Sequence, residues 1–494
     1  MPYNIKNILN SYKFEKNSKD KNIYLKLFKA LKSAITNGAL TDNIKMPPSR
    51  ILAKDIGISR STVIKAYELL VVEKYLFSVP GSGYYVSSVN DKKIQQVRFE
   101  NRVDGKYPKI SKRAKSFVNN SYTVNIRVPK GVPFRPGLPP LDIFPVTTWK
   151  KLSNDYWKSV KSSELSYSDS YGLLKLREQI SEYLKIYRNI DCDSNQIIVT
   201  TGSLHSLYLL SNSLIDKNDE VVIENPIYPH AHSLLKSLNA KFCYANIDSE
   251  GICINEINCD KPKMVYTTPS NQSPTGVKMS LKRRTELLEW ASLKNTVVVE
   301  DDYDHEFSNW EKPISALYSL DKQQRVVYLG TFNKLLHPSI RLGYMVVPNF
   351  LINPINSIYE QSSRFVPSSI QTIMSSFIEK DHLNVHLRNV IEISQERKRL
   401  FITLFERKFE NNIKLDSTNM GLHIIGNLNN EIDDMKLVKF LSKQGIESFP
   451  LSYYYHGTYK KMGLVLGFCS VRNALIKENI NKMSKAYSEF LNIN

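Results

Sequence analysis

The sequence has little cysteine and no long apolar run. It contains five cysteines in 494 residues, an odd number without a CxxC pair: Cys192, Cys243, Cys253, Cys259 and Cys469. We therefore expect reduced thiols in a cytoplasmic protein, with no disulfide framework and no metal site built on cysteine. The first ten residues hold no apolar core of signal-peptide length, and runs such as 297–299 are far too short to cross a bilayer, so no membrane partner is expected.

Acidic residues are scarce in one part of the chain only. Residues 1–130 carry 25 of the 67 lysines and arginines but only 9 of the 48 aspartates and glutamates, which gives a net charge of +16. The remaining 364 residues have a net charge of +3. A basic N-terminal quarter on a near-neutral body indicates a polyanionic partner such as nucleic acid, and a solubilising lysine surface is the alternative.

The length and the local pattern divide the chain into several parts. A chain of 494 residues exceeds one ordinary domain, and a hydrophobic content of 42% suffices for a sizeable core. We expect a polar tail over residues 1–21, a first domain over 22–88, a linker over 89–132 and a second domain over 133–494. The linker is assigned because it holds 11 Lys/Arg and 3 Asp/Glu with little periodicity.

The first domain has the pattern of a winged helix-turn-helix. Ser49 and Ser59 are candidate N-caps of two helices, and Pro80-Gly81-Ser82-Gly83 has the composition of a hairpin turn. The expected elements are helices over 23–36, from Ser49 to Gly57 and from Ser59 through Leu70, and strands over 75–79 and 84–87.

This module is expected to bind double-stranded DNA. A recognition helix that opens with Ser-Arg-Ser-Thr can reach base edges and phosphates in the major groove, and two glycines allow a tight wing. A small helical dimerisation module is the alternative, but the wing and the charge favour DNA. The candidate DNA-binding residues are Arg50, Arg60, Ser61, Thr62, Lys65, Gly81 and Gly83.

The second domain alternates short β-branched runs with helical stretches such as 281–293. This alternation predicts an α/β fold with a mostly parallel sheet. We expect a large lobe over about 145–364 and a small α+β lobe over about 365–494. The expected strands are 197–200, 221–224, 264–268, 296–300, 326–329 and 344–347.

Polar residues at the ends of these strands match the needs of pyridoxal 5'-phosphate (PLP). An aldehyde cofactor of this kind requires a lysine for a Schiff base, a carboxylate for the pyridine nitrogen, and cations with backbone N–H groups for the phosphate. Lys334, Asp301, Arg341 and the turn at 200–203 supply one of each. Tyr303 can hydrogen-bond to the phenolate oxygen of the ring.

Each of these residues alone has an ordinary explanation. A lysine after a strand is usually a solvated end, and Asp301, Asp302 and Asp304 also fit a charged loop or a weak metal cluster. No histidine or cysteine stands at ligand spacing and no calcium-loop glycine follows, so we expect no metal. The cofactor prediction depends on the complete set.

Two family resemblances strengthen these predictions. The segments SRILAKDIGISRSTVIKAYELL and GSGYYV resemble the GntR-type winged helix over about residues 22–88. The second domain resembles fold-type-I aminotransferases, and the combination resembles the MocR/GabR-type transcription regulators. The motifs that carry this are FRPGLPPLDIFP, YSDSYGLLKLREQI, TTGSLHSL, ENPIYPHA, TPSNQSPTGVKMS, VVVEDDYDHEF and GTFNKLLHPSIRLGYMVVP.

The resemblance implies a role for each site residue. Lys334 would be the PLP lysine, Asp301 the partner of the pyridinium and Tyr303 the partner of the ring oxygen. The resemblance also implies a homodimer, usually head-to-tail, in which Tyr167 reaches the partner subunit's phosphate. Tyr228 would stack on the ring, and the phosphate would be bound by Arg341, Thr331, Gly202 and Ser203.

The amino-acid clamp of aminotransferases looks incomplete in this sequence. Residues 427–471 contain no arginine, and Arg472 comes later than expected. His230, an effector-contact candidate, stands where some amino-acid-sensing relatives have arginine. Ser273 replaces a frequent asparagine, and Leu204 is apolar beside the phosphate site. Lack of a planar bidentate donor weakens carboxylate recognition, so we expect half-reactions at most rather than efficient transamination.

The resulting hypothesis is a bacterial transcription regulator. It would bind operator DNA and sense an amine or amino acid, or PLP itself, through an aldimine at Lys334. An active aminotransferase with an appended DNA-binding domain is the first alternative. A PLP-independent binding module in a decayed enzyme scaffold is the second, and the complete cofactor set speaks against it.

Overall fold

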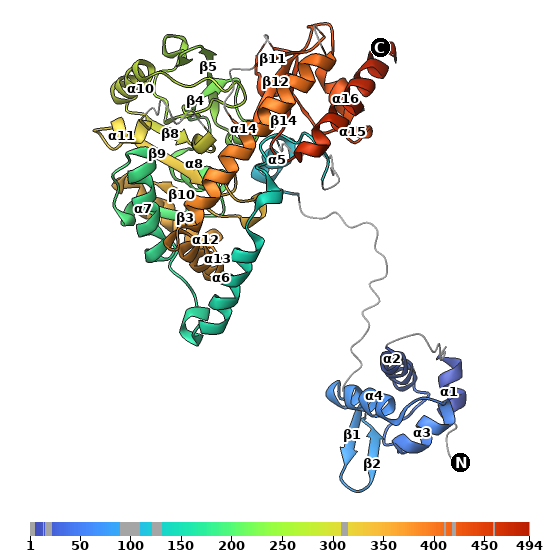
Figure 1. Ribbon diagram of the computed structural model, residues 1–494. Coiled ribbons are helices and arrows are strands. Elements are labelled where there is room, and N and C mark those ends of the chain that lie inside the picture. The colour runs from blue at the N-terminus through green and yellow to red at the C-terminus, as the bar shows by residue number, and fades with distance from the viewer. Residues whose placement is uncertain are drawn as a thin grey trace. The chain divides into compact units, whose positions relative to one another are not determined.

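The structure, a computed structural model, describes residues 5–12, 14, 22–88, 109–120, 131–307, 315–409, 412–416, 421–457 and 460–493. The chain divides into two compact units, residues 1–109 and 110–494 (Figure 1). None of the helices in these ranges has the length and apolar character needed to cross a membrane.

The smaller unit is a winged helix-turn-helix, as predicted. Its β-hairpin pairs antiparallel in the register Leu76↔Val86, and Tyr67 at the centre of the last helix is fully buried. Ser59 caps that helix as expected, since its side chain accepts a hydrogen bond from the Thr62 N–H at 3.2 Å. The elements are α1 Ile5–Ser11, α2 Ile23–Thr36, α3 Ser49–Ile56, α4 Arg60–Val72, β1 Leu76–Val79 and β2 Gly83–Val86.

Two details of this unit differ from the predictions. Ser49 lies inside α3 and makes no capping hydrogen bond, because Pro48 occupies the cap position. The tail predicted over residues 1–21 contains helix α1, whose Ile5 and Leu9 are buried in the core beside α2. Two apolar residues four apart are enough to bury one face of a short helix, although the rest of the segment is polar. Residues 1–4, 13 and 15–21 lie outside the described ranges.

The larger unit is built on an eight-stranded sheet with the order β3-β10-β9-β8-β7-β4-β5-β6. The five neighbours from β9 to β5 are parallel, whereas β10 is antiparallel to both β3 and β9. The strands of the sheet are β3 Ile197–Thr200, β4 Glu220–Asn225, β5 Lys241–Asp248, β6 Gly251–Ile252, β7 Met264–Thr267, β8 Val297–Asp301, β9 Val326–Thr331 and β10 Gly343–Val346. The helices of the large lobe are α6 Val146–Ser159, α7 Leu174–Arg188, α8 Ser203–Leu214, α9 Pro229–Ser237, α10 Leu281–Lys294, α11 Leu317–Leu320, α12 Asn349–Ser362 and α13 Ser368–Glu379.

The mostly parallel α/β fold was predicted, and six of the strands fall within two residues of the expected bounds. The sequence pattern did not indicate β5 and β6. Only Ala245 is buried along the eight residues of β5, because this strand lies near the edge of the sheet. A strand that is only partly buried lacks the apolar run by which buried parallel strands are recognised.

A long helix, α14 His382–Phe409, joins the large lobe to the small one (Figure 1). Its first turns pack Leu383 and Leu387 into the core of the large lobe, whereas Phe401 and Phe405 belong to the core of the small lobe. We predicted that the small lobe begins near residue 365, but its core starts within α14. The small lobe contains a four-stranded antiparallel sheet, β11-β12-β14-β13. Its elements are β11 Lys414–Asp416, β12 His423–Asn427, α15 Asp434–Lys443, β13 Phe449–Pro450, β14 Gly463–Gly467 and α16 Asn473–Ile493.

The segment predicted as a linker includes one helix of the larger unit, α5 Lys112–Asn120. The Ser116 hydroxyl donates to the Asn239 side chain at 3.2 Å, and Ser233 of α9 hydrogen-bonds to the Asn120 carbonyl. Residues 89–108 and 121–130 lie outside the described ranges. Helix α5 escaped prediction because it is short, its apolar residues are only Ala114, Phe117 and Val118, and none of its side chains is buried.

Candidate cofactor site

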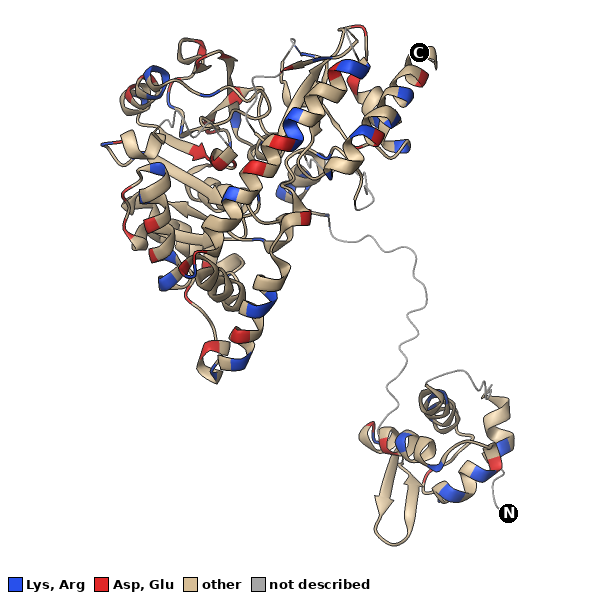
Figure 2. Cartoon of the chain, viewed as in Figure 1, with Lys and Arg blue, Asp and Glu red and all other residues tan. Residues whose placement is uncertain are grey.

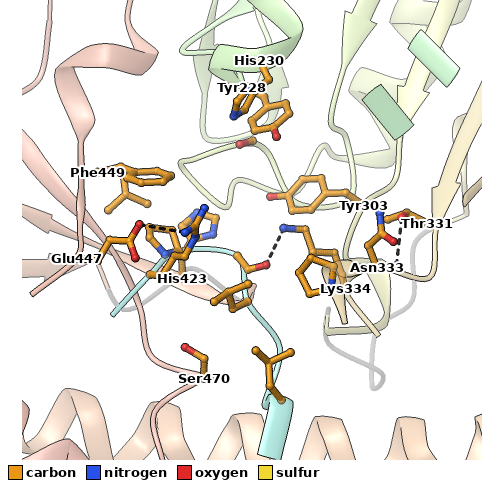
Figure 3. A pocket seen from close by; sticks show the side chains of 18 of the residues that line it. Tyr228, His230, Tyr303, Thr331, Asn333, Lys334, His423, Glu447, Phe449 and Ser470 are labelled. Carbon is orange, nitrogen blue, oxygen red and sulfur yellow. Dashed lines mark hydrogen bonds and ion pairs between the residues drawn. The ribbon is translucent and has the colours of Figure 1, made fainter. Parts of the chain in front are cut away.

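A cavity of about 1180 Å³ in the larger unit lies where the predicted cofactor residues meet (Figure 3). Strands β8 and β9 end at this cavity, and helix α8 begins there. In open α/β sheets the carboxyl ends of the parallel strands form the ligand site. Of the predicted cofactor residues, the structure brings together Lys334, Asp301, Tyr303, Tyr228, Arg341, Thr331, Gly202 and Ser203, along with His230.

Lys334 is held close to the backbone of a distant segment. Its Nζ donates a hydrogen bond to the Gly137 carbonyl at 2.7 Å. Burial lowers the pKa of Lys334, although the Asp304 and Asp301 carboxylates act in the opposite direction. A lysine with a lowered pKa offers the neutral amine that attacks an aldehyde.

Asp301 is the last residue of β8, and only one of its two carboxylate oxygens accepts a hydrogen bond from the described residues. The Tyr266 hydroxyl donates to Asp301 Oδ2 at 2.6 Å, whereas Oδ1 is buried and has no hydrogen-bond partner among the described residues. Burial raises the pKa of Asp301 to about 6, since only 6% of the residue is exposed. A buried acceptor without a donor fits the protonated nitrogen of a pyridine ring.

A cradle for a phosphate lies at the first turn of α8. Gly202 has a φ of +129°, and a Cβ there would lie 2.9 Å from Asn333 Nδ2 and 3.9 Å from the Arg341 guanidinium. Ser203 begins the helix, whose N-terminal N–H groups attract anions. Thr331 ends β9 close by and accepts a hydrogen bond from the Asn333 N–H at 3.2 Å. Glycine therefore leaves space that an anion can occupy between a helix N-terminus and a cation.

Three aromatic side chains surround the lysine. Tyr228 and His230 enter from one side of the cavity, and Tyr303 lies beside Lys334 (Figure 3). The rings of Tyr228 and His230 are 5.3 Å apart. Burial lowers the pKa of His230, and the positive charge of Lys334 adds to that effect. His230 therefore presents a neutral ring at neutral pH.

Tyr167, the ninth predicted cofactor residue, does not line the cavity. It is 79% exposed, and the Arg364 guanidinium lies 4.9 Å from its ring centroid. The role assigned to it, contact with the phosphate of a partner subunit, stays a prediction.

The carboxylates that follow β8 have separate partners. Asp302 pairs with Arg188 at 2.8 Å. Burial acts to raise the pKa of Asp302, but the Arg188 charge together with hydrogen bonds from Ser270 and Tyr328 lowers it to about 2. Asp304 accepts a hydrogen bond from Asn271 at 2.7 Å, and burial raises its pKa to about 8. The carboxylates at the end of β8 therefore differ in charge at neutral pH, since Asp302 is ionised and Asp304 is mostly protonated.

Sequence reasoning missed the residues that the small lobe contributes to the cavity. His423 begins β12 and its Nε2 lies 2.9 Å from the Pro274 carbonyl oxygen, and burial lowers its pKa to about 4. Glu447, Phe449, Val465 and Ser470 line the same wall. Arg135 reaches the cavity from the motif FRPG, which was noted only as a family signature.

In the smaller unit, the predicted DNA-binding residues lie on one helix pair and its wing. Arg50 of α3 and Arg60, Ser61 and Lys65 of α4 are exposed, and Thr62 is half-buried. Lysines and arginines occur on several helices of this unit (Figure 2). The Arg60 Nε lies 3.3 Å from the Ser49 hydroxyl. The wing turn is exposed, and the glycines at 81 and 83 have φ of +75° and +121°.

Comparison with known proteins matches both units. The profile of bacterial regulatory proteins of the gntR family matches residues 23–86, and that of class I and II aminotransferases matches residues 134–477. The chain belongs to the class I and II aminotransferase family and carries a GntR winged helix, the architecture of the MocR/GabR-type regulators. Its cofactor is PLP.

Full-length relatives share both parts. The chain is 29% identical over 465 residues to the probable rhizopine catabolism regulatory protein MocR of Rhizobium meliloti, covering 94% of each chain. It is 25% identical over 463 residues to the pyridoxine biosynthesis regulator PdxR of Corynebacterium glutamicum, covering 94% of this chain and 95% of that one. The fold of the larger unit is also that of an archaeal alanine:glyoxylate aminotransferase, with a TM-score of 0.68, 23% identity and coverage of 77% and 96%. The GntR domain implies that the chain binds DNA.

Proposed function

We propose that this chain is a bacterial transcription regulator that binds operator DNA and responds to a ligand at Lys334. The ligand is an amine or amino acid that reacts at the bound cofactor, or PLP itself. The observation that carries the proposal is the pair formed by Lys334 and the free buried oxygen of Asp301, in a chain that also has a winged helix. PLP supplies an aldehyde for the amine and an electron-withdrawing ring.

Each site residue has one task in this proposal. Lys334 would attach the cofactor, Asp301 would hold the proton on the pyridine nitrogen, and Tyr303 would contact the ring oxygen. Tyr228 would cover one face of the ring. The phosphate would be bound by Arg341, Thr331, Gly202 and Ser203 at the cradle, where glycine leaves the space open.

On the DNA side, α4 supplies the side chains that would enter the major groove. Arg60, Ser61 and Lys65 are exposed near the N-terminus of α4, where recognition helices contact bases and phosphates. The backbone at Gly81 and Gly83 would approach a phosphate from the wing. A homodimer with head-to-tail subunits, working in the cytoplasm, would place two such helices on one operator.

A sensor role is favoured over turnover by the small-lobe wall. Val465 of β14 and Phe449 of β13 line the cavity there, and residues 427–471 contain no arginine. The small-lobe strands therefore lack the arginine with which aminotransferases usually clamp the substrate carboxylate. The aminotransferase alternative predicts steady turnover of an amino donor with a keto acid.

The test is DNA binding by the full chain, with and without PLP and candidate amines. We expect a 5- to 150-fold change in operator affinity, about 1–3 kcal/mol, and an equal effect of operator DNA on effector affinity. The variant Lys334→Ala should lose the response to amines, whereas Lys322→Ala, at an exposed lysine of the same unit, should keep it. Equal DNA affinity under all conditions would contradict the proposal, and sustained turnover without any effect on DNA would favour the enzyme.

A further inference from the structure

We infer that Arg135 is the carboxylate-binding residue of the effector site, so that the effector is a primary amine that also carries a carboxylate. This inference rests on the proposed function. Arg135 lies outside the strands of the small lobe. Aminotransferases usually carry their carboxylate-binding arginine in that lobe.

Arg135 belongs to a segment whose backbone is fixed against the cavity. The Glu447 N–H donates to the Pro133 carbonyl at 3.0 Å, and the Gly467 N–H donates to the Phe134 carbonyl at 2.8 Å. A side chain at Gly467 would collide with the Arg135 carbonyl oxygen, so the segment is seated directly on β14. The backbone around Arg135 is therefore held in place before any ligand arrives.

The guanidinium of Arg135 has unused donors. Its Nη1 lies 3.5 Å from Glu447 Oε1, beyond a good hydrogen bond, and this is its single polar contact with the described residues. The side chain is 47% exposed and lines the cavity, whereas that of Glu447 is 5% exposed. A guanidinium carries five N–H groups in a planar fork, which suits a carboxylate bound through both oxygens.

Glu447 is a poorly compensated partner for Arg135. Its Oε1 is buried without a hydrogen bond from the described residues, and burial raises its pKa while Arg135 acts in the opposite direction. The charge of Arg135 is thus only partly neutralised by a loose ion pair. A ligand carboxylate would compete with Glu447 for the same guanidinium.

The other cations of the cavity are less suited to this role. Lys334 and Arg341 would hold the cofactor. Arg472 also lines the cavity, but its side chain is 71% exposed and its Nε lies 3.8 Å from Asp142. Arg135 is close enough to Lys334 for its charge to lower the pKa of that amine. A carboxylate on an amine held at Lys334 therefore meets Arg135 as the available donor.

The experiment uses the full chain loaded with PLP and follows the absorbance of the bound cofactor during titration with amines. The ligands are glycine, β-alanine and 4-aminobutyrate, the carboxylate-free propylamine, and the diamine putrescine. We expect at least one carboxylated amine to bind 10-fold or more tightly than propylamine. Arg135→Ala should weaken that amine by about 10- to 100-fold and leave propylamine within 3-fold, and Arg135→Lys should recover only part of the loss because it cannot bind bidentately.

Two further variants keep the test decisive. Glu447→Gln keeps the size of the side chain but removes the competing anion, so the carboxylated amine should bind more tightly. Arg472→Ala should change its affinity by less than 3-fold, and an unchanged amount of bound cofactor per chain shows that each variant is folded. The inference is overturned if Arg135→Ala retains full affinity for carboxylated amines, or if putrescine binds best.

Failure of this inference and failure of the proposed function have different signatures. If amines change DNA affinity but do so independently of Arg135, the regulator proposal stands and the carboxylate site is wrong. If Arg135 governs amine binding but no amine changes DNA affinity, the carboxylate site stands and the regulator proposal is wrong.

Discussion

Replacing Asp301 by asparagine should have opposite effects on the empty and the PLP-loaded protein. The carboxyl group is almost completely buried, and burial raises its pKa to about 6 from an ordinary 3.8. Because the pKa is higher in the folded state, the protonated carboxyl stabilises the fold below about pH 4, and this stabilisation is lost as the pH rises through 6. The full difference corresponds to about 3 kcal/mol.

In the cofactor-free protein, Asp301→Asn removes the ionisable group and therefore the loss of folding stability that accompanies its ionisation. Between pH 5 and pH 8 the free energy of unfolding of Asp301→Asn should therefore rise by about 1 kcal/mol relative to the wild type. The measurement is urea unfolding of the cofactor-free chain at several pH values. The amide oxygen can still accept the hydrogen bond from Tyr266, so the local structure is kept.

In the PLP-loaded protein the same change would remove the proposed partner of the pyridinium. Loss of one member of a buried charge pair typically costs about 3–5 kcal/mol, so the affinity for PLP should fall by roughly two to four orders of magnitude. Asp302→Asn is the matched control, because Arg188 lowers the pKa of that neighbouring carboxyl to about 2. Asp302→Asn should lose the most stability above about pH 4, so its pH dependence should be opposite to that of Asp301→Asn. The reasoning is refuted if Asp301→Asn binds PLP normally, or if its pH trend follows that of Asp302→Asn.

Three further outcomes follow from the same structure. Gly202→Ala should weaken PLP binding about 10-fold or more in an absorbance titration, because its Cβ would lie 2.9 Å from Asn333 Nδ2 at a φ of +129°. Ser59→Ala should destabilise the smaller unit by about 1 kcal/mol in thermal unfolding, since it removes the cap of α4, and Ser59→Thr should restore most of the loss. Arg60→Ala should lower the slope of log Kd against log salt by roughly 0.9 if Arg60 contacts a phosphate, and an unchanged slope would assign it to bases instead.

The sequence predicted the winged helix and the central sheet because both leave strong local patterns. The six predicted strands are buried on both faces and read as continuous β-branched runs, as the fully buried β8 and β9 illustrate. The residues proposed to bind the cofactor also follow from the sheet, since Asp301 ends one parallel strand and Lys334 comes shortly after another.

The remainder depends on contacts between distant segments. Arg135, His423 and Glu447 are separated from Lys334 by many residues and lie on no shared periodic pattern, so only the docking of the small lobe brings them to the cavity. The fold also brings together Glu220, Cys243 and Cys259, whose potential metal-ligand atoms lie within 4.8 Å of one another. The spacing of these residues in the sequence did not indicate this cluster.

The hydrogen bond from Lys334 to the Gly137 carbonyl gives cofactor loading a structural effect of its own. An ammonium has three N–H donors, whereas a lysine nitrogen joined to an aldehyde carbon keeps one at most. The stretch around Gly137 would then rely on its two attachments to the small lobe, at Pro133 and Phe134. Attachment of an aldehyde to Lys334 would thus leave the Gly137 carbonyl with fewer hydrogen-bond donors from this nitrogen.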